Sequence, residues 1–528
     1  MGLYINTGNA GFRSARRGEY VDKSGLIRVM NATLGTEFRF SCVTRARRFG
    51  KSMAAKMLCA YYDQSCDSRE LFADLEIAGD PTFEEHLNKY PVIYVDMTSF
   101  VGRFHGDDIV ERIEEELRRD VPVAFPDVAV DKRDDLMDVL VRIAEQTDRQ
   151  FVFIIDEWDA ICREFPRESV AMDRYVSWLR RMFKSVSASR AFAVVYMTGI
   201  LPIKKYNTQS ALNNFREYSM LIPRKLASYY GFTRDEVRRL AEKHQMDFDE
   251  LQKWYDGYQI GSELSMFNPN SVIEALSNEW CESYWGTTGA FTAVTDYILM
   301  NFEGLKDNII AMLGGERVKV ETTMFSNDMR DVRSRDDVLT LLIHLGYLSY
   351  DRNSHECYIP NREVATEMEN AVKAVKWKNV VDALQQSERL MQALLCGDGD
   401  AVARGVEAVH SDSTSILSYN DENSLACVIS LAFYAARNDY HIHREYQTGS
   451  GFADLVLIPR KNVALPAVVI ELKYGETAQT ALMQIKDRHY PEKVSEYTGD
   501  LLLCGISYDR QSKQHTCQIE KVKKELHT

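Results

Sequence analysis

The chain has 528 residues, of which 45% are hydrophobic and 27% are charged, with 28 glycines and 12 prolines. This length predicts two to four domains, and the composition is that of an ordinary globular protein rather than a fibrous or low-complexity one. The formal net charge of −14 argues against a general nucleic-acid coat protein, which needs a broad basic surface, although it leaves room for a local basic groove.

The cysteines and the N-terminus indicate the compartment. Ten cysteines are scattered along the chain without a Cys-x-x-Cys pair or a Cys/His set with zinc spacing. Several lie in apolar runs, such as Cys504, which favours buried free thiols in a reducing environment. The first residues lack the apolar core of a signal peptide, and no apolar run reaches the ~18 residues of a membrane span. We therefore expect a cytoplasmic protein that does not bind a membrane.

Residues 1–230 alternate short apolar, β-rich runs with helical stretches. The predicted strands are Phe38–Val43, Pro91–Asp96, Phe151–Asp156 and Phe192–Thr198. Strands that alternate with helices predict a parallel sheet that is covered on both faces, and the uniformly apolar run 151–155 is typical of a central strand.

The loop after the first predicted strand ends in Gly50, Lys51 and Ser52, the tripeptide that closes phosphate-binding loops. A strand, a loop and then a helix place backbone N–H groups and a helix N-terminus around phosphates. We expect Lys51 to reach the terminal phosphates of ATP, Ser52 to bind Mg²⁺, and Gly50 to permit close backbone approach. The position of the usual first glycine is occupied by an arginine, and the loop forms a basic cluster of Arg45, Arg47, Arg48 and Lys51. We expect Arg47 and Arg48 to contact the nucleotide.

Two acidic residues stand at the end of the strand 151–156, where nucleotide hydrolysis requires them. An apolar strand in nucleotide-hydrolysing folds delivers an Asp to the Mg²⁺ shell, and a following Glu can polarise the attacking water. Asp156 and Glu157 fit these two roles. Thr198, at the end of the next strand, is expected to contact the γ-phosphate or to orient water, although a plain strand-end threonine is the equal alternative.

Beyond residue 230 the pattern becomes helical. Thr233 to Glu236 is a capping box that opens a helix, and a second helix is predicted over 247–255. A later helix ends at Gly346 and is followed by two short β-rich runs, which favours a winged-helix-like segment. The predicted domains are a P-loop domain over 1–230, a helical lid and winged-helix-like region over 231–365, a helical connector over 366–405 and a C-terminal domain over 406–528.

These motifs resemble the bacterial and archaeal AAA-ATPase-like family over most of residues 20–365. The matching segments are Tyr20–Ile27, Arg45–Ser52, 198–200, 212–214, 231–237, 254–258, 267–271, 284–289, 346–348 and 360–364. The arginine in place of the first loop glycine is usual in that family, whereas Ala46 stands where proline is usual. The resemblance implies an additional-strand P-loop ATPase with a helical lid, and ATPases of this kind often complete their sites between subunits, so a homo-oligomer stays an alternative to a monomer.

Near the C-terminus, two predicted strands carry a second charged cluster. Glu471 and Lys473 are two positions apart and therefore project from the same face of a strand. The short connection 459–466 predicts an antiparallel hairpin that brings Asp454 beside them. Two carboxylates that hold Mg²⁺ or Mn²⁺, next to a lysine that orients water, are the groups that phosphodiester hydrolysis needs.

This cluster resembles the PD-(D/E)xK nuclease domain that often follows the same ATPase family. The matching residues are Glu422-Asn423, Gly449–Asp454, Glu471–Lys473, Gln484-Ile485 and Tyr490, with Phe452 where arginine is usual. The resemblance implies a restriction-endonuclease-like α/β domain over about 420–495. It also implies that Glu422 completes the acidic cluster and that Gln484 steers the substrate.

Together the two clusters predict an enzyme: an ATPase coupled to a magnesium-dependent nuclease, with nucleic acid as the partner and DNA favoured over RNA. The rival hypothesis is a nucleotide-switched scaffold whose nuclease-like domain binds nucleic acid or protein without cutting. A small-molecule kinase would share Gly50 to Ser52 but would leave the C-terminal acids unexplained.

Overall fold

A computed structural model describes residues 2–522 except 105, 130, 132–133, 166–168, 204, 207–208, 211, 262–263, 286–294, 296, 299, 301, 330, 375–377, 414–431, 449–450, 460–464, 488–499, 510–511 and 513. The chain forms two compact units, one of Met1–Gly289 with Lys319–Glu367 and the other of Ala290–Val318 with Met368–Thr528.

The first unit is built on a five-stranded sheet. Its strands are β1 (Phe40–Thr44), β2 (Val92–Asp96), β3 (Phe151–Asp156), β4 (Phe192–Gly199) and β7 (Arg216–Tyr218). They are all parallel and lie in the order β2-β3-β4-β1-β7. The strand β4 therefore lies between the strand that leads into the phosphate loop and the strand that ends in Asp156. This arrangement confirms the predicted additional-strand P-loop sheet.

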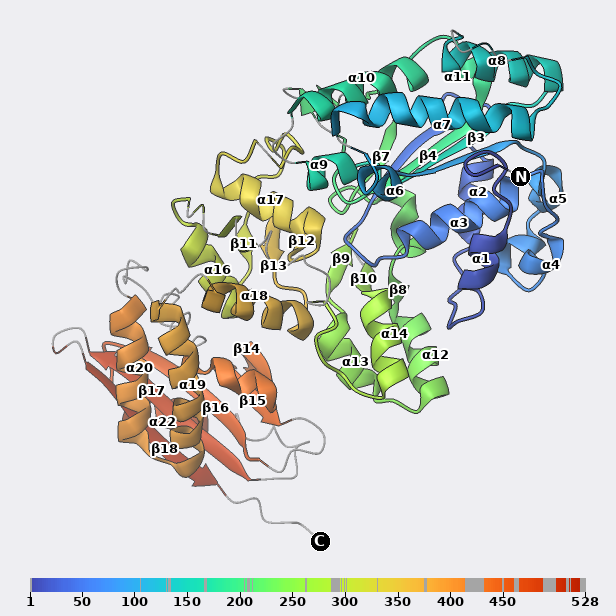
Figure 1. The fold of residues 1–528 in the computed structure, drawn as a ribbon. Helices are drawn as coiled ribbons and strands as arrows, with labels where there is room; N and C mark the ends of the chain where they lie inside the picture. Colours follow the sequence, from blue (N-terminus) through green and yellow to red (C-terminus); the bar gives the residue numbers. More distant parts are fainter. Residues whose placement is uncertain are drawn as a thin grey trace. The chain divides into compact units, whose positions relative to one another are not determined.

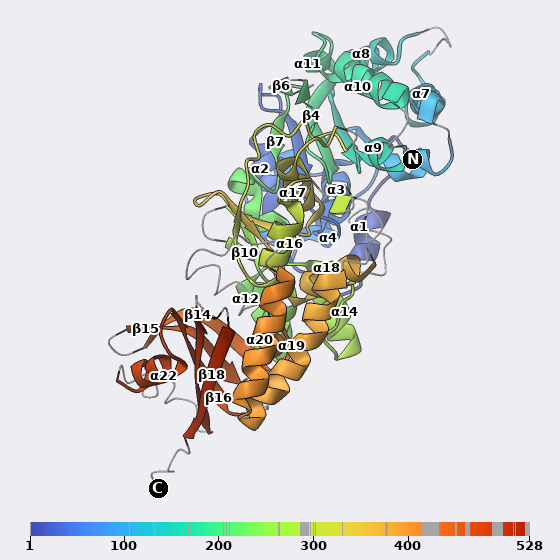
Figure 2. The same cartoon turned by 90° about the vertical axis from the view of Figure 1, so that its left-hand side faces the viewer.

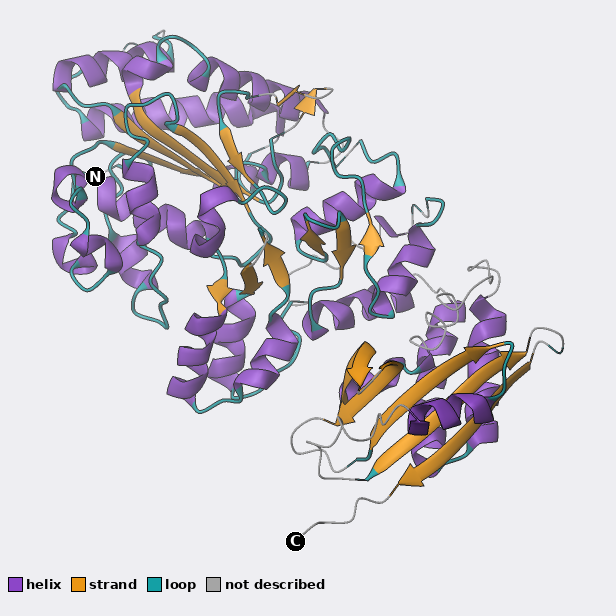
Figure 3. Cartoon of the chain, turned by 180° about the vertical axis from the view of Figure 1, so that it is seen from behind, coloured by secondary structure: helices purple, strands orange, loops and turns teal. Residues whose placement is uncertain are grey.

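Helices cover both faces of this sheet (Figures 1 and 3). One face packs against α7 (Ile109–Ala124), α8 (Leu136–Thr147) and α10 (Ser169–Phe183), and the other packs against α2 (Gly25–Asn31) and α3 (Lys51–Tyr62). Alternate residues of β3 join the two cores, so the strand is buried along its whole length. The predicted bounds of these strands differ from the observed ones by at most two residues, and the largest difference is at the start of the first strand. Phe38 is 55% exposed, and β1 begins two residues later, where the side chains become buried.

The lid consists of three helices beside a small sheet. Its helices are α12 (Arg234–His244), α13 (Phe248–Tyr255) and α14 (Pro269–Asn278), and its strands are β8 (Phe232–Thr233), β9 (Tyr258–Ile260) and β10 (Leu264–Phe267). The predicted capping box is present, because the Thr233 hydroxyl accepts from the Glu236 N–H while the Glu236 carboxylate accepts from the Thr233 N–H. A second cap, Asp247, opens α13.

The winged-helix-like segment has the predicted helix, glycine turn and hairpin. These are α17 (Arg335–Leu345), Gly346 with φ of +89°, β12 (Ser349–Asp351) and β13 (Glu356–Tyr358). The segment packs on the lid, because the Tyr258 hydroxyl donates to the Gly346 carbonyl at 3.0 Å. A Cβ at Gly257 would lie 2.0 Å from the Pro360 carbonyl oxygen. The aromatic motif 254–258 therefore contributes to the contact between the lid and the winged-helix-like segment.

The second unit contains a mixed sheet in the order β14-β15-β16-β17-β18. Its strands are β14 (Tyr440–Thr448), β15 (Gly451–Pro459), β16 (Ala467–Tyr474), β17 (Leu501–Asp509) and β18 (Gln514–Val522). Only β16 and β17 are parallel, and α22 (Ala478–Asp487) lies between them in the chain. Figure 2 shows α22 on one face of this sheet and α20 (Gly399–Ser413) on the other, beside α19 (Lys378–Cys396). Two helices from the predicted connector region thus pack with the C-terminal sheet.

The remaining elements are short or lie outside the two centres considered below. They are α1 (Ala10–Ala15), α4 (Arg69–Phe72), α5 (Phe83–His86), α6 (Met97–Val101), α9 (Ala160–Glu164), α11 (Ala188–Ala191), α16 (Leu305–Leu313), α18 (Arg362–Ala374), β5 (Lys205–Tyr206), β6 (Gln209–Ser210), β11 (Val318–Lys319) and the 3₁₀ turns 76–79, 106–108, 224–229 and 434–438.

The cysteines in the described part of the chain are free thiols, as expected. Cys42, Cys59, Cys357 and Cys504 are buried, whereas the others are partly buried or, for Cys396, exposed. Across the described residues, no helix combines the length and the apolar character that crossing a membrane requires.

Candidate functional site

The phosphate loop has the shape that its sequence predicts. Gly50 has φ of +85° and directly precedes α3, and a Cβ placed there would meet nothing within 4 Å. The glycine is therefore required by its backbone conformation rather than by crowding, and it leaves the N-terminus of α3 open to an anion. Arg48 also has a left-handed backbone, with φ of +67°.

Arg45 does not join the predicted basic cluster. Its side chain is fully buried and donates to the carbonyls of Thr44 and Tyr218, each at 2.8 Å. The guanidinium lies 5.3 Å from the centre of the Tyr230 ring, and burial lowers the pKa of Arg45 to about 10. The arginine that replaces the first loop glycine thus ties the loop to the edge strand β7 and to the chain beyond it.

Lys51 lies at the start of α3, between the loop and the end of β3. Its ammonium donates to the Ala46 carbonyl at 3.0 Å and lies 3.5 Å from Glu157 Oε1. The residue is only 4% exposed. Because a carbonyl and a carboxylate hold this ammonium in place, its positive charge is already positioned where phosphates are expected to bind.

Asp156 ends the central strand β3 and is 3% exposed. Its Oδ2 accepts from the Tyr94 hydroxyl at 3.2 Å, whereas its buried Oδ1 has no hydrogen-bond partner among the described residues. Burial raises the pKa of Asp156 to about 6, although the nearby hydroxyl of Ser52 counteracts part of this rise. A buried carboxylate oxygen beside a serine hydroxyl fits the oxygen-rich ligand set of Mg²⁺.

Glu157 has a strained backbone with φ of +52°, which is uncommon for a residue other than glycine. Its carboxylate contacts Lys51 on one side and forms an ion pair with Arg163 on the other. Burial raises the pKa of Glu157, but Lys51 and Arg163 outweigh burial and hold the pKa below its usual value. The carboxylate is therefore ionised near neutral pH.

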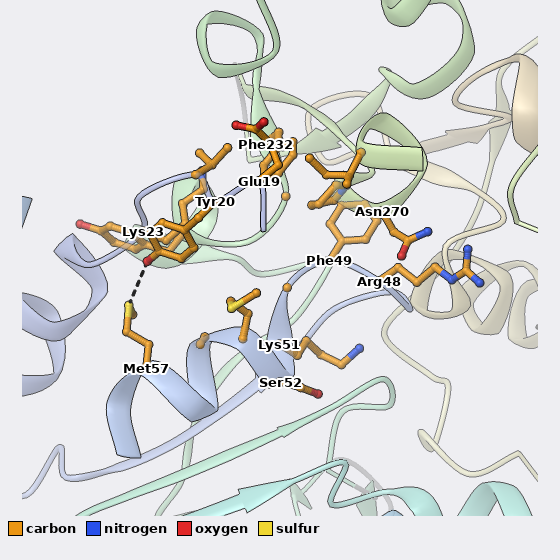
Figure 4. Close-up of a pocket in the computed structure, with 18 of the residues that line it drawn as sticks. Glu19, Tyr20, Lys23, Arg48, Phe49, Lys51, Ser52, Met57, Phe232 and Asn270 are labelled. Carbon is orange, nitrogen blue, oxygen red and sulfur yellow. Dashed lines mark hydrogen bonds between the residues drawn. The ribbon is translucent and has the colours of Figure 1, made fainter. Parts of the chain in front are cut away.

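Gly50, Lys51 and Glu157 line a cavity of about 380 Å³ between the loop and the lid. This volume falls within the roughly 300–1,000 Å³ that is typical of small-molecule pockets. Figure 4 shows Lys51 and Ser52 at the start of α3, with Tyr20 and Phe232 farther along the cavity. The lining combines polar groups such as Lys51 and Ser52 with apolar side chains from the N-terminal segment, α3 and the lid, namely Tyr20, Val21, Met53, Met57, Phe232 and Ile273. A phosphate chain would contact the polar groups of this lining, and a flat, apolar base would contact its apolar side chains.

Three of the predicted nucleotide contacts lie less directly at this cavity. Arg48 lines it, but its guanidinium also donates to the Tyr284 carbonyl at 2.8 Å. Arg47 and Thr198 are absent from the lining, and Thr198 is fully buried behind the loop, opposite Val43 in the β1–β4 ladder. Their predicted contacts with nucleotide therefore stay predictions.

In the second unit, β15 and β16 form the predicted antiparallel hairpin. The last pair of their ladder is Leu455 with Ile470, and immediately beyond it Asp454 Oδ2 accepts from the Leu472 N–H at 2.6 Å. The Asp454 side chain thus accepts a hydrogen bond from the backbone of β16 at the point where the backbone pairing of the two strands ends. This hydrogen bond fixes the Asp454 carboxylate beside the segment that carries Glu471 and Lys473.

Glu471, which is 2% exposed, contacts two other predicted residues, Lys473 and Gln484. Its Oε1 lies 3.5 Å from the Lys473 ammonium and accepts a hydrogen bond from the Gln484 side chain on α22. Gly505, opposite Glu471 on β17, lets that helix approach closely, because a Cβ there would lie 2.3 Å from the Ala478 carbonyl oxygen. The structure therefore brings Asp454, Glu471, Lys473 and Gln484 to one end of the hairpin.

Two carboxylates with an adjacent ammonium suit a hard divalent cation such as Mg²⁺ or Mn²⁺. Among the residues described, no group of three or more His, Cys, Asp or Glu side chains is placed to hold a metal ion. The predicted third acid, Glu422, lies outside the described residues, as do Asn423 and Tyr490.

The sequence analysis did not identify Arg163, which contacts Glu157, or Asp159, which contacts Arg163. Arg163 pairs with both Glu157 and Asp159, and Asp159 is fully buried. Their separation of four residues in the segment that follows Glu157 was a usable signal, because it places both side chains on one face of a helix. Also missed was Glu363, a fully buried acid that accepts from the Tyr284 N–H at 2.9 Å.

Comparison with known proteins agrees with both centres. A family model described as a predicted AAA-ATPase matches residues 8–208, and the model of the PD-(D/E)XK nuclease superfamily matches residues 420–517. A curated relative, named as an uncharacterized protein in the vnfD 5′ region of Azotobacter chroococcum mcd 1, is 23% identical over 530 residues, which is 95% of this chain and 96% of the relative.

Two solved structures from Aeropyrum pernix also match, each at 12% identity. The ORC2 protein in ADPNP–ADP complexes has a TM-score of 0.24 and covers 67% of this chain and 93% of its own. The ORC1 protein in complex with DNA has a TM-score of 0.25 and covers 71% and 98%. At these scores the likeness supports no conclusion about this chain.

The loop, the acids at the tip of β3 and the hairpin cluster thus coincide with the matched segments. Residues 8–208 form a domain of the predicted AAA-ATPase family, and residues 420–517 belong to the PD-(D/E)XK nuclease superfamily.

Proposed function

We propose that this chain binds and hydrolyses ATP in its first unit and cleaves nucleic-acid phosphodiesters with a divalent metal in its second. The observation that carries the proposal is shared by both centres. Each places a lysine 3.5 Å from an acid that is largely shielded from water, namely Lys51 beside Glu157, whose side chain is 18% exposed, and Lys473 beside Glu471, whose side chain is 3% exposed. Holding such charges away from water favours a chemical role, because it costs stability.

In the ATPase centre, the chain supplies groups for binding and for proton transfer. Lys51 exchanges its contacts with Ala46 and Glu157 for the terminal phosphates, and the N–H groups at the start of α3 bind the same oxygens. Glu157 then faces the attacking water and orients it through a hydrogen bond. Bound Mg²⁺, held by Ser52 and Asp156, would neutralise charge on the phosphates.

In the nuclease centre, Lys473 orients the attacking water, and Asp454 and Glu471 would hold the divalent metal. A divalent ion would supply Lewis-acid stabilisation of the attacked phosphate. Gln484 holds the Glu471 carboxylate in place through its hydrogen bond. DNA is the substrate that we propose, and the nucleotide state of the first unit controls cleavage.

The test is a nicking assay on supercoiled plasmid, with oligonucleotides of DNA and RNA in parallel. Wild type, Lys51→Ala and Asp454→Ala are compared with Mg²⁺ or Mn²⁺, with and without ATP. We expect Asp454→Ala to abolish cleavage while it leaves ATP turnover intact, and Lys51→Ala to abolish turnover and the effect of ATP on cleavage. Cleavage that survives Asp454→Ala would remove the nuclease assignment.

A nucleotide-switched scaffold is the second candidate. The acidic net charge of −14 and Phe452, which stands where the nuclease family usually has arginine, favour it. In a scaffold, nucleic acid binds in Ca²⁺ without turnover in any metal. Tight binding in Ca²⁺ together with cleavage in Mg²⁺ or Mn²⁺ supports the nuclease instead.

A further inference from the structure

Glu157 has a second cationic neighbour that the proposed ATPase chemistry does not use. Arg163, on the short helix α9, donates from Nη2 to Glu157 Oε2 and has a side chain that is only 10% exposed. Glu157 itself lines the nucleotide cavity. The guanidinium thus contacts Oε2 of Glu157, whereas Lys51 lies near Oε1.

Arg163 is itself held in place from the other side. Its Nε lies 3.4 Å from Asp159 Oδ2, and Asp159 accepts from the backbone N–H groups of Ile200 and Leu201 at 3.2 and 2.9 Å. A Cβ at Gly199 would lie 2.5 Å from Asp159 Oδ1, so the turn after β4 needs glycine to admit this carboxylate. The guanidinium is therefore anchored to the end of β4.

Lys51 cannot fix Glu157 throughout a reaction cycle. Its ammonium is shared between Glu157 and the Ala46 carbonyl in this structure, and a nucleotide attracts it to the terminal phosphates. The Glu157 carboxylate then keeps its ion pair with Arg163, at a backbone position that is already strained.

We propose that Arg163 is a positioning residue for ATP hydrolysis: its guanidinium orients Glu157 toward the attacking water, and Asp159 anchors that guanidinium to the turn after β4. This inference rests on the proposed ATPase activity of the first unit. It assigns the pair Asp159 and Arg163 to the chemical step rather than to nucleotide binding, because neither residue lines the cavity.

The test is steady-state ATP hydrolysis by the full chain, with nucleotide affinity measured separately by fluorescence of a labelled ATP analogue. The variants are Arg163→Ala, Arg163→Gln and Arg163→Lys. The matched control is Arg190→Ala, which removes another arginine–glutamate pair of the same unit, with Glu145, where both side chains are about half exposed. Thermal melting shows which variants fold, and Arg163→Gln carries the test if Arg163→Ala does not fold.

We expect kcat to fall about 10- to 100-fold in Arg163→Ala and Arg163→Gln, since small misplacements of a catalytic group have effects of this size. KM and nucleotide affinity should stay within about twofold of wild type, and Arg163→Lys should recover much of the lost kcat because it keeps the charge. Equal kcat in wild type and Arg163→Ala, a loss that appears only in KM, or no recovery in Arg163→Lys would overturn the positioning role. Absence of turnover in the wild-type chain would instead overturn the proposed function itself.

Discussion

The two centres differ in how far apart their parts lie in the sequence. The nuclease cluster is assembled from one hairpin and the helix that follows it, between Asp454 and Gln484. The nucleotide site draws on the loop at 45–52, the tip of β3 and the turn after β4. A centre built from neighbouring segments is legible in the sequence pattern. When a centre is assembled across a sheet, its motifs can be recognised in the sequence, but the residues that support them cannot.

The largest effect that we expect separates the two centres. Glu157→Gln removes the charge that faces the attacking water while it keeps the shape of the side chain. ATP turnover should fall about 10²- to 10⁴-fold, the usual contribution of such a group, while cleavage measured without ATP stays unchanged. Glu164→Gln, an exposed acid on the same segment, is the matched control. Parallel loss of both activities would show that the centres are not separable.

A backbone change should damage the first unit alone. In Gly257→Ala the new Cβ meets the Pro360 carbonyl oxygen at 2.0 Å, and the φ of +102° is unfavourable for alanine. We expect a loss of about 2–4 kcal/mol in stability from this overpacking. Gly261→Ala is the control, because its φ is also positive but its nearest neighbour is 3.9 Å away. Thermal melting compares the two variants, and equal melting temperatures would contradict the clash.

The support of the nuclease cluster can be tested on α22. Gln484→Ala removes the side chain that donates to Glu471, so metal-dependent cleavage should fall about 10- to 100-fold, as is usual when a metal ligand loses its supporting hydrogen bond. Gln479→Ala, an exposed glutamine on the same helix, should leave cleavage unchanged. The measurement is initial nicking rate against Mg²⁺ concentration, and ATP turnover should not respond to either variant.

The smallest expected effect depends on pH. The pKa of Glu363 is raised to about 7, mainly by burial. The positive charge of Arg48 lowers this pKa, and the negative charge of Glu367 raises it. Because the folded state holds this proton more tightly than the unfolded state, wild-type stability falls as pH rises from about 4.5 through 7. Glu363→Gln keeps an acceptor for the Tyr284 N–H and carries no charge.

The melting temperature of Glu363→Gln relative to wild type should therefore rise by about 2–4 °C between pH 5 and pH 8. A difference that does not change with pH would show that Glu363 is ionised in the folded protein throughout this range. The nuclease cluster offers the contrast, since cleavage at fixed pH should be the same in both proteins.

The strands and the lid were predictable because their signals are local. The apolar run 151–155 with Asp156 after it predicted the bounds of β3, and the pattern from Thr233 to Glu236 predicted the start of α12. Similarly, the two-residue period of a strand placed Glu471 and Lys473 together. Each of these features depends on residues within a few positions of one another.

Long-range contacts explain what was not predicted. The basic residues of the loop looked equivalent in the sequence, yet Arg45 turns into the core because Tyr218 offers it a carbonyl there. The support of Glu157 by Arg163 and Asp159 depends on backbone N–H groups at the end of another strand, β4. No local pattern encodes which distant group a buried charge will meet.

The burial of Arg45 has a consequence for when the nucleotide site can exist. The carbonyl that it bonds belongs to Tyr218, which lies 173 positions later in the chain and beyond the matched segment that ends at residue 208. A fragment that stops at 208 would contain the whole loop and both strand-end acids, yet it would leave this guanidinium without its partner on the edge strand. During synthesis on the ribosome, we therefore expect the loop to reach its final shape only after β7 and Tyr230 have emerged.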